Sequence, residues 1–221
     1  TDILIFISGE RTALGLLFLS TVFIIAFLSK YKLIRLYSFI ISILLMTLIV
    51  ALSPSIKQRN IDQTISQISG NNNVDNNGDG SRRITLFSNI HGGYILGAWN
   101  MFIDNPLAGQ GAKMFRVLCS DIKFNPNEDG KNCSTHPHNL YVQLLAETGL
   151  LGLLFILILC LEITKLILNH ILLFIKKRQY LLSDFQICLI ACFIMTLWPI
   201  IPSLDFFNNW INVIYYLPAG F

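Results

Sequence analysis

Two histidines separated by one proline, His136 and His138, directly precede a long apolar stretch. An imidazole has a pKa near neutrality and can accept a proton from a hydroxyl group. We predict that one of the two acts as a base and that the other packs, while Asn139 caps the following helix. Cys133 extends the pattern to C-x2-H-x-H, but this spacing matches no common zinc signature, so we predict no metal site.

Three arginines could bind an anionic group. Arg11 stands at the edge of an apolar span, and Arg82 and Arg83 follow an Asn-rich stretch. A guanidinium group matches a phosphate or diphosphate in both charge and geometry. The alternatives are structural: Arg11 could be an interfacial anchor or a partner of Glu10, and the arginine pair could be a solvated basic patch.

Two acidic residues are weaker candidates. Glu147 lies inside the apolar stretch that follows the histidines, and buried carboxylates are rare in membrane segments unless they have a function. Asp104 comes just before Asn105 and Pro106, which is typical of a turn. Both are retained as possible members of a site.

The composition indicates a membrane protein. Of 221 residues, 53% are hydrophobic and only 13% are charged, whereas a soluble domain usually has about 25% charged residues. A bilayer core requires about 20 mostly apolar residues. Four stretches reach or approach that length: residues 12–28, 36–53, 149–168 and 185–204. We predict an all-α integral membrane protein, a multi-pass transmembrane helical bundle with a large periplasmic loop that contains short helices.

Charge distribution predicts the orientation. Short connections near residues 29–35 and 176–178 carry basic residues without acids, as cytoplasmic loops do. We therefore assign residues 1–53 to two transmembrane helices, 54–137 to the periplasmic loop, and 138–221 to further transmembrane helices. Because the chain starts with Thr1 inside an apolar region, it is expected to be the C-terminal part of a longer protein. This topology puts the arginines and histidines on one side of the membrane, where they could converge.

The large loop has recognisable parts. Residues 69–81 are rich in Asn, Gly and Asp and are expected to be a mobile excursion. Apolar residues at helical spacing between 84 and 103 predict an amphipathic helix near the membrane surface, and Gly109-Gln110-Gly111 predicts a turn. A helix is expected from Leu140 through Leu161, with a continuation toward Lys176 left open. Cys119 and Cys133 could form a disulfide in an oxidising compartment, but their spacing alone does not decide this.

One family resemblance joins these parts. His138-Asn139, nine further residues and then Gly149-Leu150-Leu151-Gly152 resemble the H-N-x9-G-x-x-G signature of O-antigen ligases. Trp99 and the stretch 104–111 are similar to the pattern that precedes this histidine in the ligase and polymerase superfamily. Arg11 resembles the arginine that opens the family's homologous region. The resemblance extends from Arg11 to about Asn209.

The resemblance implies a glycosyltransferase of the bacterial inner membrane whose active site faces the periplasm. The donor would be an undecaprenyl-diphosphate-linked glycan, and the acceptor a lipid A core sugar hydroxyl. Arg11 and one of Arg82 or Arg83 would bind the diphosphate, and His138 would be the base. Transfer would invert the anomeric centre without metal or cofactor, and membrane lipids rather than nucleic acid would be the other partners. The alternatives are an O-antigen polymerase, a protein O-oligosaccharyltransferase and a non-enzymatic transporter of the same lipid-linked glycan.

Overall fold

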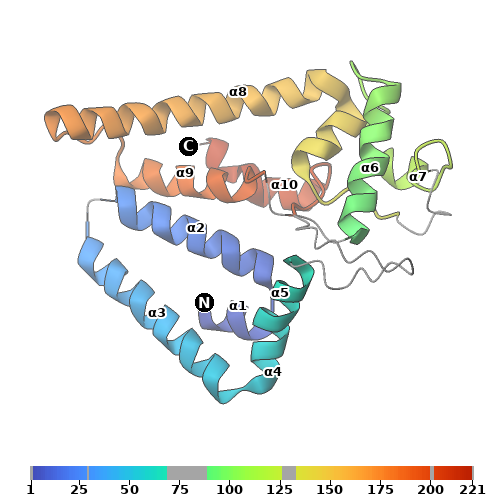
Figure 1. The fold of residues 1–221 in the computed structure, drawn as a ribbon. Coiled ribbons are helices and arrows are strands. Elements are labelled where there is room, and N and C mark those ends of the chain that lie inside the picture. Colours follow the sequence, from blue (N-terminus) through green and yellow to red (C-terminus); the bar gives the residue numbers. More distant parts are fainter. Residues whose placement is uncertain (1, 29, 69–88, 126–132, 200–201, 221) are drawn as a thin grey trace. The chain divides into compact units, whose positions relative to one another are not determined.

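The computed structural model describes residues 2–28, 30–68, 89–125, 133–199 and 202–220, and all regular structure in these ranges is helical. The all-α prediction is therefore confirmed for this part of the chain. The predicted excursion at 69–81 lies outside the described residues. The chain divides into two compact units, Thr1–Asn89 and Ile90–Phe221, which are described separately (Figure 1).

The first unit holds two long apolar helices and a bent polar extension. Two of the predicted spans appear as helices, with Phe18 and Phe39 packed edge to face between them at 5.6 Å. The second ends before Pro54, as predicted, but a new helix begins at that proline because its fixed φ suits the first helical position. The elements are α1 (Asp2–Ser8), α2 (Arg11–Phe27), α3 (Lys32–Leu52), α4 (Pro54–Lys57), the π-helix η1 (Gln58–Asp62) and α5 (Gln63–Ile68).

The second unit contains the histidine segment and the longest helix. Its elements are α6 (Asn89–Asp104, of which Asn89 belongs to the first unit), α7 (Phe115–Leu118), α8 (Leu140–Lys177), α9 (Asp184–Thr196), α10 (Asn209–Tyr216) and the 3-10 helix η2 (Leu217–Gly220). The amphipathic helix predicted to stop at Asp104 is confirmed as α6. Its Ala98 and Met101 are completely buried, whereas Trp99 and Ile103 are exposed.

In the ranges that the structure describes, two helices, α3 and α8, are long and apolar enough to cross a membrane. Among the described residues, α2 and α9 are apolar but shorter. Most large side chains of α3 and of the second part of α8 are exposed, as expected for surfaces that face lipid. Helix α9 corrects the prediction for residues 185–204, because it already ends at Thr196.

The early end of α9 has a structural cause. Beyond its last turn, two backbone carbonyls accept hydrogen bonds from the side chains of Asn139, the residue before α8, and Tyr141, in the first turn of α8. The Tyr141 hydroxyl donates to the Leu197 carbonyl at 2.6 Å, and the Asn139 amide donates to the Pro199 carbonyl at 2.9 Å. Pro199 and Pro202 also lack the N–H group that a continuing helix would need. The chain after α9 therefore lies alongside the first turn of α8, to which it is hydrogen-bonded.

Helix α8 is broken at Gly149, whose backbone has φ 64° and ψ −159°. In a continuous helix the N–H groups of residues 150 and 151 would donate to the carbonyls of 146 and 147. Here they donate to the carbonyls of Pro106 and Leu107, at 2.9 and 3.3 Å. The vacated carbonyls accept from the N–H groups of Gln110 and Gly111, both at 2.9 Å. The loop 106–111 thus pairs these four backbone groups. Figure 1 shows the short first part of α8 set at an angle to the remainder.

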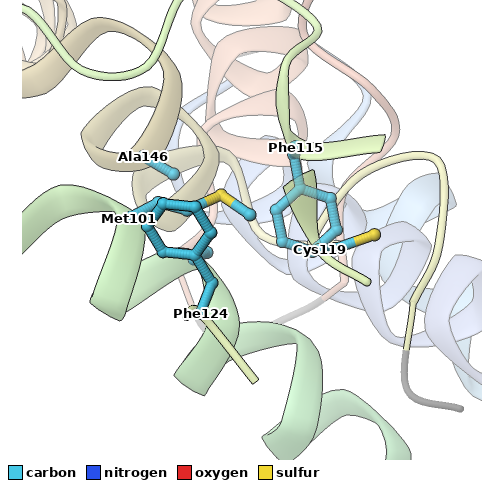
Figure 2. Close-up of a cluster of buried hydrophobic side chains, with 6 residues drawn as sticks. Met101, Phe115, Cys119, Phe124 and Ala146 are labelled. Atoms are coloured by element: carbon cyan, nitrogen blue, oxygen red, sulfur yellow. The ribbon is translucent and has the colours of Figure 1, made fainter. Parts of the chain in front are cut away.

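A small hydrophobic core joins α6, α7 and the first part of α8. Its labelled members gather around one another in Figure 2, and the disulfide-bonded Cys119 lies among them. They share almost complete burial: Met101, Phe115, Cys119, Phe124 and Ala146. This core includes Ala146, close to the break in α8, and Cys133 packs against it. The core therefore holds the start of the histidine segment against α6 and α7.

Candidate functional site

The histidine segment begins at a covalent anchor. Cys119 and Cys133 form a disulfide with Cα atoms 5.3 Å apart, which confirms the pairing that the sequence left open. Cys119 is completely buried at the end of α7. The bond also removes Cys133 as a thiolate ligand for the zinc alternative. Within the described ranges, no three His, Cys, Asp or Glu side chains are grouped as they would be around a metal ion.

Removing this disulfide is expected to weaken the site and the fold together. Closing a chain of about 14 residues contributes roughly 3 kcal/mol of stability in the loop-entropy account. We expect Cys119→Ala/Cys133→Ala to lower the melting temperature of the detergent-solubilised protein. Cys192→Ala, at an exposed free cysteine, is the matched control. A double variant that melts at the wild-type temperature would contradict this expectation.

The backbone at His138 is held in an uncommon conformation. Its φ is 56°, in the left-handed region that non-glycine residues rarely occupy. The His138 carbonyl accepts from the Ser203 N–H at 2.9 Å. The next residue, Asn139, accepts from the N–H groups of Tyr141 and Val142, both at 3.1 Å, so the predicted helix cap is confirmed. Such conformations persist only when their surroundings fix them, and they are enriched at functional sites.

The His138 side chain lies among polar and aromatic groups. Its Nε2 is 3.2 Å from the Ser134 hydroxyl. Its ring centroid lies 4.1 Å from that of His136, 5.4 Å from that of His91 and 5.6 Å from that of Tyr94. His91 and Tyr94 come from α6 and are three residues apart, so they share one helix face. The site therefore combines the segment before α8 with one side of α6.

The environment keeps His138 uncharged at neutral pH. Burial is the main cause that lowers the pKa of His138 to about 4, and repulsion from the imidazoles of His136 and His91, when these are protonated, acts in the same direction. Desolvation and like charges both disfavour the protonated imidazole. At pH 7 the ring therefore has an unprotonated nitrogen, which is the form required of a proton acceptor.

His136 is arranged differently. It is buried, and both ring nitrogens have partners: Nε2 lies 3.2 Å from the Ser203 carbonyl oxygen and Nδ1 lies 3.1 Å from the Thr135 hydroxyl. Because a carbonyl can only accept, Nε2 carries the proton and Nδ1 accepts from Thr135. Burial is the main cause that lowers the pKa of His136. Its nitrogens are thus committed to the protein.

Glu147 is placed in a buried network. One carboxylate oxygen accepts from the Phe115 N–H at 2.9 Å, and the other accepts from the Gln143 amide at 3.1 Å. The same amide donates to Asp205 at 2.6 Å, and Asp205 pairs with Arg116 at 3.0 Å. With 1% of its surface exposed, Glu147 ties α7 to α8 and does not present its carboxylate to solvent.

Asp104 lies at the other end of α6. Its carboxylate pairs with Lys123 at 2.7 Å and accepts from the Gln110 amide at 3.1 Å. The hydrogen bonds from Lys123 and then Gln110 lower the pKa of Asp104. It lines an open pocket of about 300 Å³ together with Asn100, Ile103, Lys123 and Phe124. None of the histidines lines this pocket.

The predicted role of the three arginines in binding a diphosphate stays a prediction. Arg11 belongs to the first unit, where its Nη1 donates to the Thr64 hydroxyl at 2.9 Å. Arg82 and Arg83 lie outside the described residues. Convergence of the three arginines with His138 therefore stays a prediction.

Sequence reasoning missed three neighbours of His138. Ser134 lies four residues before it, and no pattern distinguishes this serine from other loop serines. His91 and Tyr94 occupy one face of a helix that was predicted, and a histidine three residues from a tyrosine on such a face was an available signal. Only the tertiary packing shows that this face meets His138.

In the described residues the chain is helical, with two helices long and apolar enough to cross a membrane, and a disulfide-anchored histidine segment precedes the longer of them. A family model described as O-antigen ligase matches residues 3–157, which is more than half of the chain. The chain belongs to the O-antigen ligase family, and the resemblance seen in its sequence is confirmed. No curated protein and no solved structure gave a significant match.

Proposed function

We propose that the protein transfers an O-antigen glycan from undecaprenyl diphosphate to a sugar hydroxyl of the lipid A core. The family supports an enzyme of the ligase and polymerase type, and the finer assignment is our inference. The observation that carries it is His138, an uncharged imidazole held at the start of α8 by its own backbone and by Ser134. The proposed location is the inner membrane, with the site facing the periplasm.

In the proposed reaction the acceptor hydroxyl attacks the anomeric carbon of the donor sugar. The new glycosidic C–O bond forms as the bond to diphosphate breaks, and the hydroxyl proton passes to His138. Undecaprenyl diphosphate leaves with the electron pair, and its charge is stabilised by Arg11 and by Arg82 or Arg83. Attack opposite the leaving group inverts the anomeric centre, and a product with retained configuration would refute this step.

The contact with Ser134 determines which nitrogen can act. A free lone pair on Nδ1 requires that Nε2 carry the proton and donate it to the Ser134 hydroxyl. The opposite arrangement, with Ser134 donating to Nε2, would leave His138 without an available acceptor nitrogen. We therefore assign Nδ1 as the proton acceptor, with the Nε2–H group donating to the Ser134 hydroxyl.

The test is an acceptor panel. Purified full-length protein in liposomes would receive a lipid-linked glycan donor together with lipid A core, a second donor molecule or a pilin-like protein, one at a time. We expect product only with lipid A core. Extension of a second donor would instead show a polymerase, and glycosylation of Ser or Thr would show a protein O-oligosaccharyltransferase. Movement of the donor across the bilayer without any covalent product would show a transporter.

A further inference from the structure

Two aromatic rings of α6, one helical turn apart, contact the His138 ring. His91 meets the His138 ring edge-on, with an interplanar angle of 75°, and Tyr94 lies tilted to it by 32°. The two rings are also in contact with each other at 5.9 Å. Together with His136, whose ring centroid lies 4.1 Å from that of His138, these rings form one cluster, to which α6 and the segment before α8 each contribute two members.

A base must be held in orientation as well as in position. The backbone contacts at His138 fix its Cα, but they leave the side-chain torsions to be set by neighbours. The Ser134 hydroxyl contacts one ring nitrogen at 3.2 Å. A single hydrogen bond still allows the ring to swing about that contact. The rings of His91 and Tyr94 contact the imidazole with centroids at 5.4 and 5.6 Å, and we expect them to limit that rotation.

Helix α6 is itself firmly mounted. Ala98 and Met101 on α6 are completely buried. The Asn100 amide donates to the Phe124 carbonyl at 2.8 Å, and the Gln110 amide donates to the Met101 carbonyl at 2.9 Å. Tyr94 also packs against this core. Side chains on a rigidly packed helix can restrict a catalytic side chain to the narrow range of positions that catalysis requires.

We propose that His91 and Tyr94 are positioning residues for glycan transfer, which hold the His138 imidazole in its reactive orientation through ring contacts from α6. The inference rests on the proposed function. His91 has a second effect, because a positive charge on it opposes protonation of His138. In the described part of the chain, the titratable groups in ring contact with His138 are His136 on its own segment and His91 and Tyr94 on α6.

The test compares ring-removing with ring-keeping variants of the full-length protein. We expect His91→Ala and Tyr94→Ala to lower kcat by up to about 100-fold with little change in the KM for donor, as for a misplaced catalytic group. Tyr94→Phe keeps the ring and should transfer at nearly the wild-type rate. His91→Phe should retain most of kcat at pH 7, but its acid limb should move to higher pH because a charge that lowers the pKa of His138 is gone. Leu96→Ala, on an exposed part of α6, is the control.

Assaying His138→Ala beside the α6 variants distinguishes failure of the positioning role from failure of the proposed function. If His138→Ala abolishes transfer while His91→Ala and Tyr94→Ala stay at the wild-type rate, the positioning role is wrong and the proposed function stands. If His138→Ala transfers normally, the proposed function is wrong and the positioning role falls with it. If the alanine variants fail to fold, the ring-keeping variants decide: a His91→Phe or Tyr94→Phe protein that folds but loses kcat about 100-fold overturns the proposal.

Discussion

Replacing His138 with alanine is expected to lower the rate of glycan transfer by about 100-fold to 10,000-fold, the usual contribution of a general base. Donor binding should persist, because the proposed diphosphate contacts come from the arginines. The measurement is product formed per unit time with lipid A core as acceptor, alongside binding of the lipid-linked donor. His170→Gln is the control, since His170 is a buried histidine of α8 that accepts from the Leu182 N–H.

The pH dependence adds a second readout of the same residue. With a pKa lowered to about 4, His138 stays unprotonated as the pH falls through the ordinary histidine range. Transfer limited by this base should therefore decline only as the pH approaches 4. The unfolded chain binds a proton at this position below about pH 6.5, whereas the folded chain does not. His138 thus destabilises the folded state progressively between those two values as the pH falls.

The sequence was sufficient where local rules decide the outcome. Apolar length predicted α2 and α3, and the turn signal at Asp104 predicted where α6 ends. Asn139 was recognised as a cap because a side-chain acceptor at that position satisfies free N–H groups of the first helical turn. The two loop cysteines were identified as a possible pair, and their geometry then had to come from the structure.

Long-range pairing decided what the sequence could not show. The end of α9 depends on hydrogen bonds from Tyr141 and Asn139, which lie more than fifty residues earlier in the chain. Glu147 was predicted as a possible site member because it is a carboxylate in an apolar stretch, and only the structure shows that its oxygens accept from Phe115 and Gln143. Local sequence patterns contain no information about hydrogen-bond partners that are distant in the chain.

Gly149 shows how one signature residue can serve the fold. We expect Gly149→Ala to destabilise the protein by about 3 kcal/mol or more, because its backbone conformation is essentially restricted to glycine. An added Cβ would also lie 2.4 Å from the Leu107 carbonyl oxygen, which belongs to the backbone and cannot rotate away. The loop 106–111 would have to withdraw, so the exchanged hydrogen bonds at the break would be lost. The measurement is the melting temperature of the solubilised protein, followed by transfer activity.

Gly92→Ala provides the contrast, since a Cβ at Gly92 in α6 would meet no atom within 4 Å among the described residues. An alanine in a helix costs less chain entropy than a glycine, so this variant should be neutral or more stable by about 0.5–1 kcal/mol. If Gly149→Ala also melted at or above the wild-type temperature, the break in α8 could not be the conformation of the folded protein. If it melted much lower, the second half of the H-N-x9-G-x-x-G signature would have a physical explanation: Gly149 lets the loop 106–111 pack against the helix that His138 and Asn139 begin.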